Sequence, residues 1–147
     1  MNKIITATIQ ELGPLVEMFD LYRQFYRQPS DVLGAKEFLT ERIKKKDSVI
    51  FLAIQREEYT GFVQCYPLFT SVGMKKLWLL NDLFVKNEYR GQGISKMLIG
   101  RCKQLAFETG AKGLMLETEK SNAIGNRLYP EEGFVLNEGS NFYVWTR

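Results

Sequence analysis

The residues best suited to chemistry form a glycine loop, Arg90-Gly91-Gln92-Gly93, between an apolar run and an amphipathic segment. Glycine adopts positive φ and, lacking a Cβ, lets the backbone approach a ligand closely. The first N–H groups of a helix that starts here have no internal partners and carry about half a positive charge. Such a loop suits a phosphate or pyrophosphate, with Arg90 as a neighbouring cation. A tight turn with a surface arginine is the alternative interpretation.

Two other phosphate-binding loops do not fit this sequence. No segment matches the pattern G-x-x-x-x-G-K-[ST]. The dinucleotide-binding fingerprint needs a third glycine where Lys96 stands, early in a parallel βαβ fold. Here the loop comes late, after a predicted hairpin and an apparently antiparallel strand. The sequence therefore argues against both architectures.

Composition restricts the chemistry further. The chain has 147 residues, of which 45% are hydrophobic and 25% charged, as expected for one globular domain spanning 1–147. Histidine is absent, which excludes Ser-His-Asp and Cys-His catalysis and histidine metal sites. The two cysteines, Cys65 and Cys102, lack metal-ligand spacing, so we expect no metal. A net charge of +3 gives no support for nucleic-acid binding.

Hydrophobic runs also bear on the compartment. None is long enough to cross about 30 Å of hydrocarbon, so no membrane contact is expected. The first residues, Met1-Asn2-Lys3-Ile4, continue without the apolar core of a secretory signal. Together with the low cysteine content, this predicts a cytoplasmic, reduced protein.

Hydrophobic periodicity predicts the elements that position the loop. The expected order is βααβββαβαββ, a mixed α/β domain with a strand–loop–helix unit at its centre. The predicted strands cover residues 4–9, 49–55, 59–68, 76–85, 114–118, a short stretch at Val135, and 142–146. The predicted helices cover residues 14–26, 35–46, 94–109 and 122–132.

Two motifs resemble the GNAT N-acetyltransferase superfamily. Arg90-x-x-Gly93-x-Ser95 resembles its acetyl-CoA loop, Arg/Gln-x-x-Gly-x-Gly/Ala, with serine at the last position. Residues 122–134 read N-x-x-G-x-x-L-Y-x-x-x-G-F and resemble its N-x-x-A-x-x-L-Y-x-x-x-G-F signature. The strand through Asp82-Leu83-Phe84-Val85 resembles the family's fourth strand. The resemblance extends over the element order and implies the GNAT fold, with about seven mostly antiparallel strands and about four helices.

The resemblance implies acetyl-CoA as cosubstrate. Backbone amides of the loop would hold the pyrophosphate, and the pantetheine arm would pair with the preceding strand, whose N–H would also stabilise the oxyanion. Asn122 would hold its helix start and the cosubstrate, or only cap the helix. The cosubstrate-binding residues expected on this basis are Leu83, Phe84, Val85, Arg90, Gly91, Gln92, Gly93, Ile94, Ser95, Lys96 and Asn122.

The transfer requires two proton movements. An alkylamine with a pKa near ~10.4 costs about 4–5 kcal/mol to deprotonate at neutral pH, so a base or a desolvated pocket must help. The resemblance implies Tyr129 as the acid for the departing thiolate; an aromatic core residue is the alternative. In diamine acetyltransferases a Glu-Asp pair stands where this chain has Asn81-Asp82. Side chains alternate along a strand, so we expect Asn81 and Asp82 on opposite faces. Asp82 re-aimed by a bulge, Glu117, and water without a dedicated base are the three candidates.

The acceptor is expected to enter over the first two helices and the hairpin. Tyr22, Phe25 and Tyr26 lie close together on the first helix and either fill the core or line the entrance. The substrate-binding residues that we expect are Tyr26 and Asn81. The resemblance implies a primary amine of a small molecule, nearest to the diamine type. Protein N-termini or lysines are the alternative acceptors, and a non-catalytic acyl-CoA-binding module is the alternative function. The resemblance also allows a homodimer.

Overall fold

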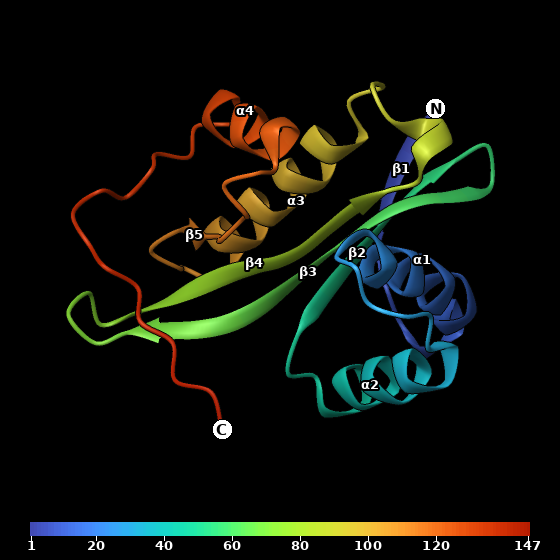
Figure 1. Ribbon diagram of the computed structural model, residues 1–147, viewed down its shortest axis with the longest axis horizontal. Coiled ribbons are helices and arrows are strands. Elements are labelled where there is room, and N and C mark those ends of the chain that lie inside the picture. Colours follow the sequence, from blue (N-terminus) through green and yellow to red (C-terminus); the bar gives the residue numbers. More distant parts are fainter. The chain divides into compact units, whose positions relative to one another are not determined.

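The computed structural model describes residues 1–147 as two compact units, Met1–Leu116 and Glu117–Arg147 (Figure 1). The first unit holds a five-stranded sheet in the order β1-β2-β3-β4-β5, with the helices α1, α2 and α3. Neighbours from β1 to β4 are antiparallel, whereas β5 is parallel to β4. The α/β class and the mixed sheet are confirmed, with five strands in place of about seven.

The elements have the following bounds. The strands are β1 (Asn2–Thr6), β2 (Val49–Gln55), β3 (Glu58–Thr70), β4 (Lys75–Val85) and β5 (Leu114–Met115). The helices are α1 (Leu12–Phe25), α2 (Val32–Lys45), α3 (Ile94–Glu108) and, in the second unit, α4 (Ala123–Glu131). Two short 3-10 helices are η1 (Ile9–Glu11) and η2 (Asn87–Tyr89).

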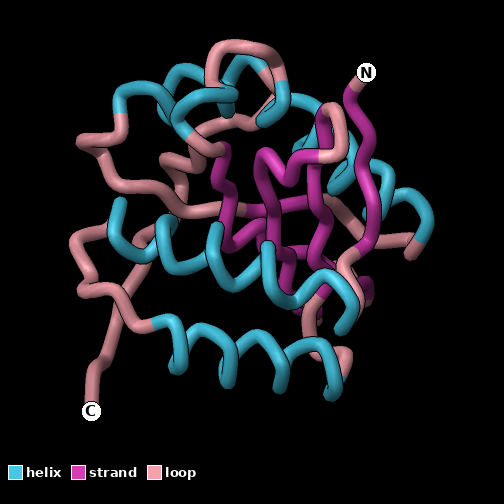
Figure 2. The backbone as a smooth tube through the Cα atoms, turned by 90° about the vertical axis from the view of Figure 1, so that its right-hand side faces the viewer, coloured by secondary structure: helices cyan, strands magenta, loops and turns pink.

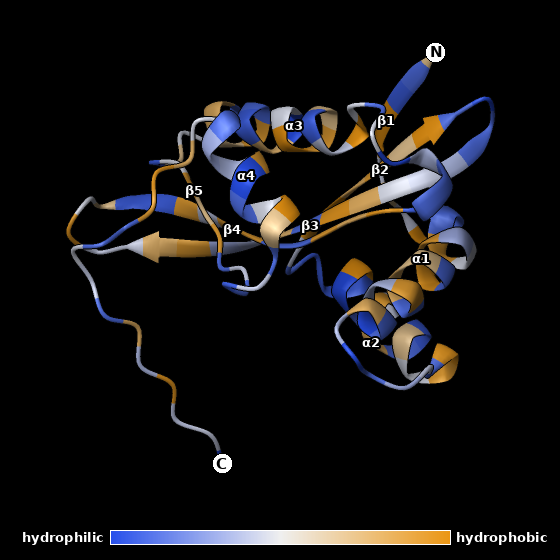
Figure 3. Ribbon diagram, turned by 45° about the horizontal axis from the view of Figure 1, so that its top comes forward, coloured by the Kyte–Doolittle hydropathy of each residue, from blue (hydrophilic) through white to orange (hydrophobic).

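The sheet of the first unit has helices on both faces. Phe62 and Phe84 belong to the apolar cluster that α1 and α2 complete on one face. On the other face Cys65 of β3 meets Cys102 of α3, with their Sγ atoms 3.4 Å apart. Figure 2 shows α1 and α2 running side by side, and Figure 3 shows apolar residues gathered where the helices face the sheet. Burying these faces supplies most of the stability that holds β4 in place.

Element boundaries differ from the predictions where a capping side chain decides them. The helix expected from residue 35 begins at Val32, because the Asp31 carboxylate accepts from the Gly34 N–H at 2.9 Å. The first strand ends at Thr6, because the Thr8 hydroxyl starts η1 by accepting from Gln10 N at 3.2 Å. Such caps satisfy N–H groups that a helix start would otherwise leave unpaired.

The C-terminal strand predictions are wrong. Residues 134–147 contain no strand, and β5 ends at Met115 instead of continuing to residue 118. In the second unit α4 is the one regular element. A strand exists only where a neighbouring strand pairs with it, and alternation in Phe142 to Thr146 does not supply that neighbour. The helix predicted over 122–132 is confirmed as α4, with Asn122 as its N-cap.

The turn between α1 and α2 is held by the buried carboxylate of Asp20, which is 5% exposed. It accepts from the Ser30 hydroxyl at 2.6 Å, the Asp31 N–H at 2.8 Å and the Gln24 amide at 3.0 Å. The bond from Ser30, then that from Asp31, holds the pKa of Asp20 below its ordinary value. The ionised form is therefore the one that stabilises the turn.

Asp20→Asn is expected to lower the free energy of unfolding by about 1–3 kcal/mol at pH 7, because the new amide presents a donor where donors already converge. A folded pKa below the unfolded one stabilises the protein above about pH 3.9, and this is lost as the pH falls through the folded pKa. Urea unfolding at pH 7 and at pH 3 tests this: the difference in the free energy of unfolding between the two proteins should be smaller at pH 3. Asp31→Asn is the matched control, since asparagine also caps helices. Equal stability of Asp20→Asn and wild type at pH 7 would contradict the assignment.

Candidate functional site

Strand β4 carries a bulge at Asn81. Gln64 of β3 pairs with Asp82, but the next β3 residue, Cys65, pairs with Leu80, which leaves Asn81 as the extra residue. A bulge breaks the alternation of side chains and re-aims them. The Asn81 amide donates to Asp82 Oδ1 at 3.0 Å, so the two side chains touch although Asn81 is exposed and Asp82 is buried. The bulge that the Asp82 hypothesis requires is present.

Asp82 is a buried carboxylate, 4% exposed. The amide nitrogen of the fully buried Gln64 donates to its Oδ2 at 2.6 Å. Burial raises the pKa of Asp82 because the charged form loses water, while hydrogen bonds from Gln64, Tyr22 and Asn81 act in the opposite direction. A carboxyl group tuned by both effects is typical of functional sites.

Helix α1 brings an aromatic cluster to the bulge. The Tyr22 hydroxyl donates to the Asn81 carbonyl at 3.4 Å. The Tyr22 ring lies 5.1 Å from that of Tyr26, which lies 5.2 Å from that of Phe25, both edge-on. Tyr22 and Tyr26 are half-buried and Phe25 is 53% exposed, so the three are only partly core residues. Tyr22 therefore contacts both the ring of Tyr26 and the backbone carbonyl of Asn81.

Beyond the bulge, no strand of the sheet pairs with β4 on the side of β5, and we call this unpaired part of the strand the open edge. Strand β5 pairs only with Trp78 and Leu79. On the opposite edge the Lys86 N–H donates to Thr60 of β3 at 2.9 Å. Because hydrogen bonding alternates along a strand, the backbone groups of Leu83 and Val85 face the open edge. This edge has the polar groups that an extended, amide-bearing ligand can pair with.

The glycine loop has the backbone that its sequence predicts. Gly91 and Gly93 have φ of +74° and +80°, in the left-handed region that favours glycine. A Cβ on either would meet nothing within 4 Å, so the loop is open on that side. Gly93 is the N-cap of α3, and its carbonyl accepts from Met97 N at 3.1 Å. The N–H groups of Ile94 and Ser95 lie in the first turn of α3, so they have no hydrogen-bond partner inside the helix.

Two other loop side chains have defined surroundings. The side-chain oxygen Oε1 of Gln92 accepts from Gln55 Nε2 at 3.3 Å, which ties the loop to the end of β2. Lys96 is exposed in the first turn of α3. The loop therefore joins a fixed strand end to a helix start and presents a cation beside it.

Arg90 folds back onto the end of β4. Its Nε donates to the Val85 carbonyl at 2.9 Å, and its guanidinium carbon lies 5.8 Å and 5.9 Å from the ring centres of Phe25 and Phe84. These contacts fix the cation next to the loop that it opens. A hollow of about 390 Å³ lies here, lined by Glu17, Leu21, Phe25, Phe84, Lys86, Asn87, Glu88 and Arg90.

Asn122 and Tyr129 belong to the second unit. The Asn122 side-chain oxygen accepts from Gly125 N at 3.1 Å and so caps α4, as both interpretations of this residue require. A Cβ on Gly125 would lie 2.5 Å from Asn122 Nδ2, so alanine at this position would require the Asn122 side chain to shift. Tyr129 is half-buried, with its ring 5.8 Å from that of Phe134. Glu117, the other candidate base, is exposed.

Sequence reasoning missed Gln64 and Ser48. Gln64 is 0% exposed, and the Ser48 hydroxyl donates to its amide oxygen at 2.8 Å. The available signal was a glutamine inside the apolar run Phe62-Val63-Gln64-Cys65. A polar residue at a buried strand position must find a hydrogen-bond partner, so it marks a polar contact across the sheet. Its partner, Asp82, is 18 residues away, beyond the reach of local patterns.

The remaining polar and apolar features add no further chemistry. No helix of the chain combines the length and apolar character needed to cross a membrane. No three His, Cys, Asp or Glu side chains are grouped so that they could hold a metal ion. The hydrogen bond with Cys102, together with burial, raises the pKa of the Cys65 thiol and keeps it protonated.

Together, the bulged strand with an open edge, the glycine loop and the helix it begins suit an acyl-CoA-dependent acyltransferase. The chain belongs to the Acetyltransferase (GNAT) family, whose model matches residues 15–134. It is thus an acetyltransferase of the GNAT type, and members of this family use acetyl-CoA as cosubstrate.

Relatives of similar length support the assignment to this family. The chain is 39% identical over 137 residues to the uncharacterized N-acetyltransferase YhfO of Bacillus subtilis (strain 168), covering 93% of this chain and 92% of the relative. It is 29% identical over 136 residues to a probable acetyltransferase of Haemophilus influenzae, covering 92% and 91% of the two chains. A crystal structure of a probable acetyltransferase superposes with a TM-score of 0.94 at 35% identity, covering 99% of this chain and 97% of that one.

Proposed function

We propose that residues 1–147 act as one GNAT domain that transfers the acetyl group of acetyl-CoA directly to the primary amine of a small molecule. The observation that carries the choice of acceptor is the Asp82 carboxylate at the bulge, in contact with Tyr22, whose half-buried ring lies 5.1 Å from that of Tyr26. A carboxylate and aromatic faces both attract an alkylammonium group. Tyr26 and Asn81 are the proposed acceptor-binding residues.

Asp82 is the proposed general base. In the reaction the amine nitrogen forms a bond to the thioester carbonyl carbon, and the bond from that carbon to sulfur breaks. The proton that the amine loses passes through water to the Asp82 carboxylate. A general base works best when it is ionised before the reaction and still binds a proton well. A carboxyl group whose pKa is raised toward the working pH meets both conditions. Burial supports this role because it raises the pKa of Asp82.

The proposed cosubstrate site is the glycine loop together with the open edge of β4. The positive φ of Gly91 and Gly93 leaves their N–H groups accessible for a diphosphate, and the start of α3 adds a favourable dipole. The N–H and C=O groups of Leu83 and the N–H group of Val85 suit the amides of the pantetheine arm, while the Val85 carbonyl already accepts from Arg90. Asn122 is proposed to support this site from the start of α4.

Tyr129 is the proposed acid that protonates the departing thiolate. Tyr129→Phe is expected to lower kcat by roughly ten- to a thousand-fold, since the phenol proton is lost while the ring remains. The affinity for CoA should stay near that of wild type, which calorimetry measures. Tyr143→Phe, at an 87% exposed tyrosine of the same unit, is the matched control. A Tyr129→Phe enzyme with wild-type turnover would remove Tyr129 from the mechanism.

The function is tested with purified protein, acetyl-CoA and a panel of amines. The panel holds diamines, amino acids, amino sugars, peptides with free N-termini and lysine peptides; thiol release is followed and products are confirmed by mass. Saturable turnover with a small amine is the expected result. Turnover restricted to peptides would assign a protein acceptor. Saturable CoA binding without turnover on any amine would indicate a binding module.

A further inference from the structure

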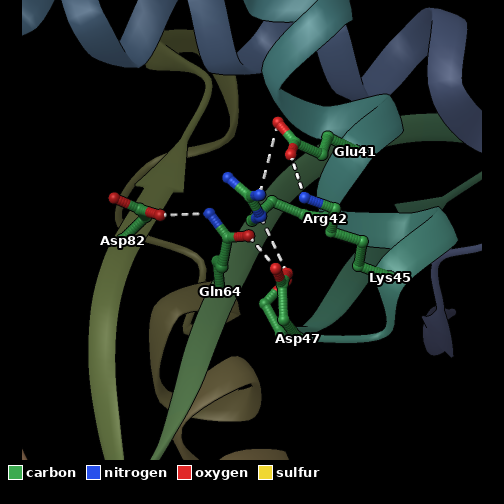
Figure 4. A network of polar contacts seen from close by, with 7 residues as sticks. Glu41, Arg42, Lys45, Asp47, Gln64 and Asp82 are labelled. Atoms are coloured by element: carbon green, nitrogen blue, oxygen red, sulfur yellow. Dashed lines mark hydrogen bonds and ion pairs between the residues drawn. The ribbon is translucent and has the colours of Figure 1, made fainter.

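Hydrogen bonds run from Ser48, in the loop after α2, through Gln64 to the carboxylate of Asp82. Figure 4 shows the contact between Gln64 and Asp82. The Ser48 hydroxyl donates to Gln64 Oε1 at 2.8 Å, and Gln64 Nε2 donates to Asp82 Oδ2 at 2.6 Å. Gln64 is 0% and Asp82 4% exposed. The three residues come from the loop before β2, from β3 and from β4.

We infer that Gln64, oriented by Ser48, is a positioning residue that keeps the Asp82 carboxylate ionised and directed for proton transfer. This inference rests on the proposed role of Asp82 as general base. Gln64 itself exchanges no proton; it acts through the carboxylate to which it donates.

The amide of Gln64 suits this task because it has a donor at one end and an acceptor at the other. The Ser48 hydroxyl donates to the oxygen end, which leaves the NH₂ end facing Asp82. A buried carboxylate without donors becomes protonated, because the charge loses its hydration. A donor at 2.6 Å opposes this effect and also fixes one of the two carboxylate oxygens in place.

Asp82 has two titratable neighbours, Tyr66 and Cys65, whose raised pKa values keep them neutral near pH 7. Tyr22 faces it from α1, and burial raises the pKa of Tyr66 on β3 to about 12. The hydrogen bond with Cys102 raises the pKa of the Cys65 thiol well above its ordinary value. The charged Arg42 of α2 donates to Asp47 at 2.7 Å instead. Asp47 is thus paired with Arg42, and Asp82 is the buried carboxyl group of this cluster.

The loop that carries Ser48 is itself anchored. Arg42 pairs with Asp47 and, at 3.5 Å, with Glu41, which also contacts Lys45 (Figure 4). The Arg42 side chain is only 17% exposed, so this pairing is less screened by salt than an open surface pair. The ion pair thus holds the residue preceding Ser48 while the hydroxyl contacts Gln64.

The test uses two measurements. NMR of the Asp82 carboxyl carbon follows the titration of that group, and kcat is measured against pH with the best amine of the panel. Gln64→Met keeps the length of the side chain and removes both hydrogen bonds. The Asp82 titration is expected to move up by about one to two pH units. In step, kcat near neutral pH should fall by roughly three- to thirty-fold while KM for acetyl-CoA stays the same.

Two further variants separate positioning from general damage to the fold. Ser48→Ala should shift the Asp82 titration in the same direction by less, and Ser48→Thr, which keeps the hydroxyl, should restore it. Thr60→Val is the matched control, since it removes another fully buried hydrogen bond of β3, from Thr60 Oγ1 to the Ala53 carbonyl at 3.2 Å. It should lower stability and leave the Asp82 titration where it was.

An Asp82 titration that is the same in Gln64→Met and wild type overturns the inference. Should Gln64→Met not fold, the Ser48 pair decides, because identical titrations in Ser48→Ala and Ser48→Thr also overturn it. The proposed function fails separately: an Asp82→Asn enzyme with full kcat refutes the base, whatever the NMR titration of Gln64→Met shows.

Discussion

Asp82→Asn is expected to lower kcat for amine acetylation by about 10²- to 10⁴-fold, the range that a lost general base typically costs. The substitution keeps the shape of the side chain and removes its ability to accept a proton. Affinity for CoA should remain near that of wild type, because the proposed pyrophosphate loop begins at Arg90, beyond the end of β4. Initial rates with the best amine of the panel, together with calorimetry of CoA binding, measure both quantities.

The pH profile distinguishes loss of a base from loss of structure. Burial raises the pKa of Asp82 above its ordinary value near 3.9, so the catalytic ionised form is populated only as the pH rises through the raised value. Wild-type kcat should therefore fall on acidification at a higher pH than an exposed aspartate would give. The Asn variant should lack this acid limb and follow only the free-amine fraction of the acceptor.

Asp20→Asn is the matched control for this substitution, since Asp20 is also a buried carboxylate but belongs to the α1–α2 turn. It should keep the wild-type pH profile at temperatures where the variant is folded. An Asp82→Asn enzyme with the turnover of wild type at every pH would leave Glu117 or water as the remaining candidates for the base.

Gly93→Val is expected to weaken CoA binding by about 10²-fold, equivalent to about 2.7 kcal/mol. A valine at φ of +80° is strained, and its branched side chain would occupy the open space beside the loop, where a Cβ now meets nothing within 4 Å. If a diphosphate approaches the backbone on that side, the side chain excludes it. Calorimetric titration with CoA measures the loss.

Gly110→Val separates ligand exclusion from backbone strain. Gly110 follows the other end of α3, has φ of +62°, and likewise has nothing within 4 Å of an added Cβ. Both variants should lose a similar amount of stability, about 1–3 kcal/mol, in thermal or urea unfolding. Only Gly93→Val should lose CoA affinity. Equal CoA affinity in the two variants and in wild type would refute the loop as the pyrophosphate site.

Features that depend on neighbouring residues were predictable. The strand over 49–55 and the helix that begins at Ile94 match their predictions, because hydrophobic period and glycine conformation act over a few residues. Gly91 and Gly93 adopt the positive φ that their loop position requires. The family was recognisable for the same reason, since its two motifs are each continuous in the chain.

Features that depend on pairing across the sheet were not predictable. The register shift that makes Asn81 a bulge, and so turns its amide to Asp82, is set by how β3 pairs with β4. The contact of Gln64 with Asp82 follows from that register. The strands predicted within residues 134–147 are absent for the same reason. Alternating hydrophobicity indicates that a segment can form a strand, but it does not identify the strand with which that segment pairs.

By itself, then, the sequence determined the glycine loop, the helix starts and the set of groups available for acid–base chemistry, since these rest on backbone freedom, capping and side-chain type. Only the tertiary structure decided which carboxylate lies buried beneath the aromatic side chains of α1, and which donor keeps it ionised. The physical reason is that the protonation state of a group depends on its hydration and on partners brought from distant segments, and both exist only after the strands have paired.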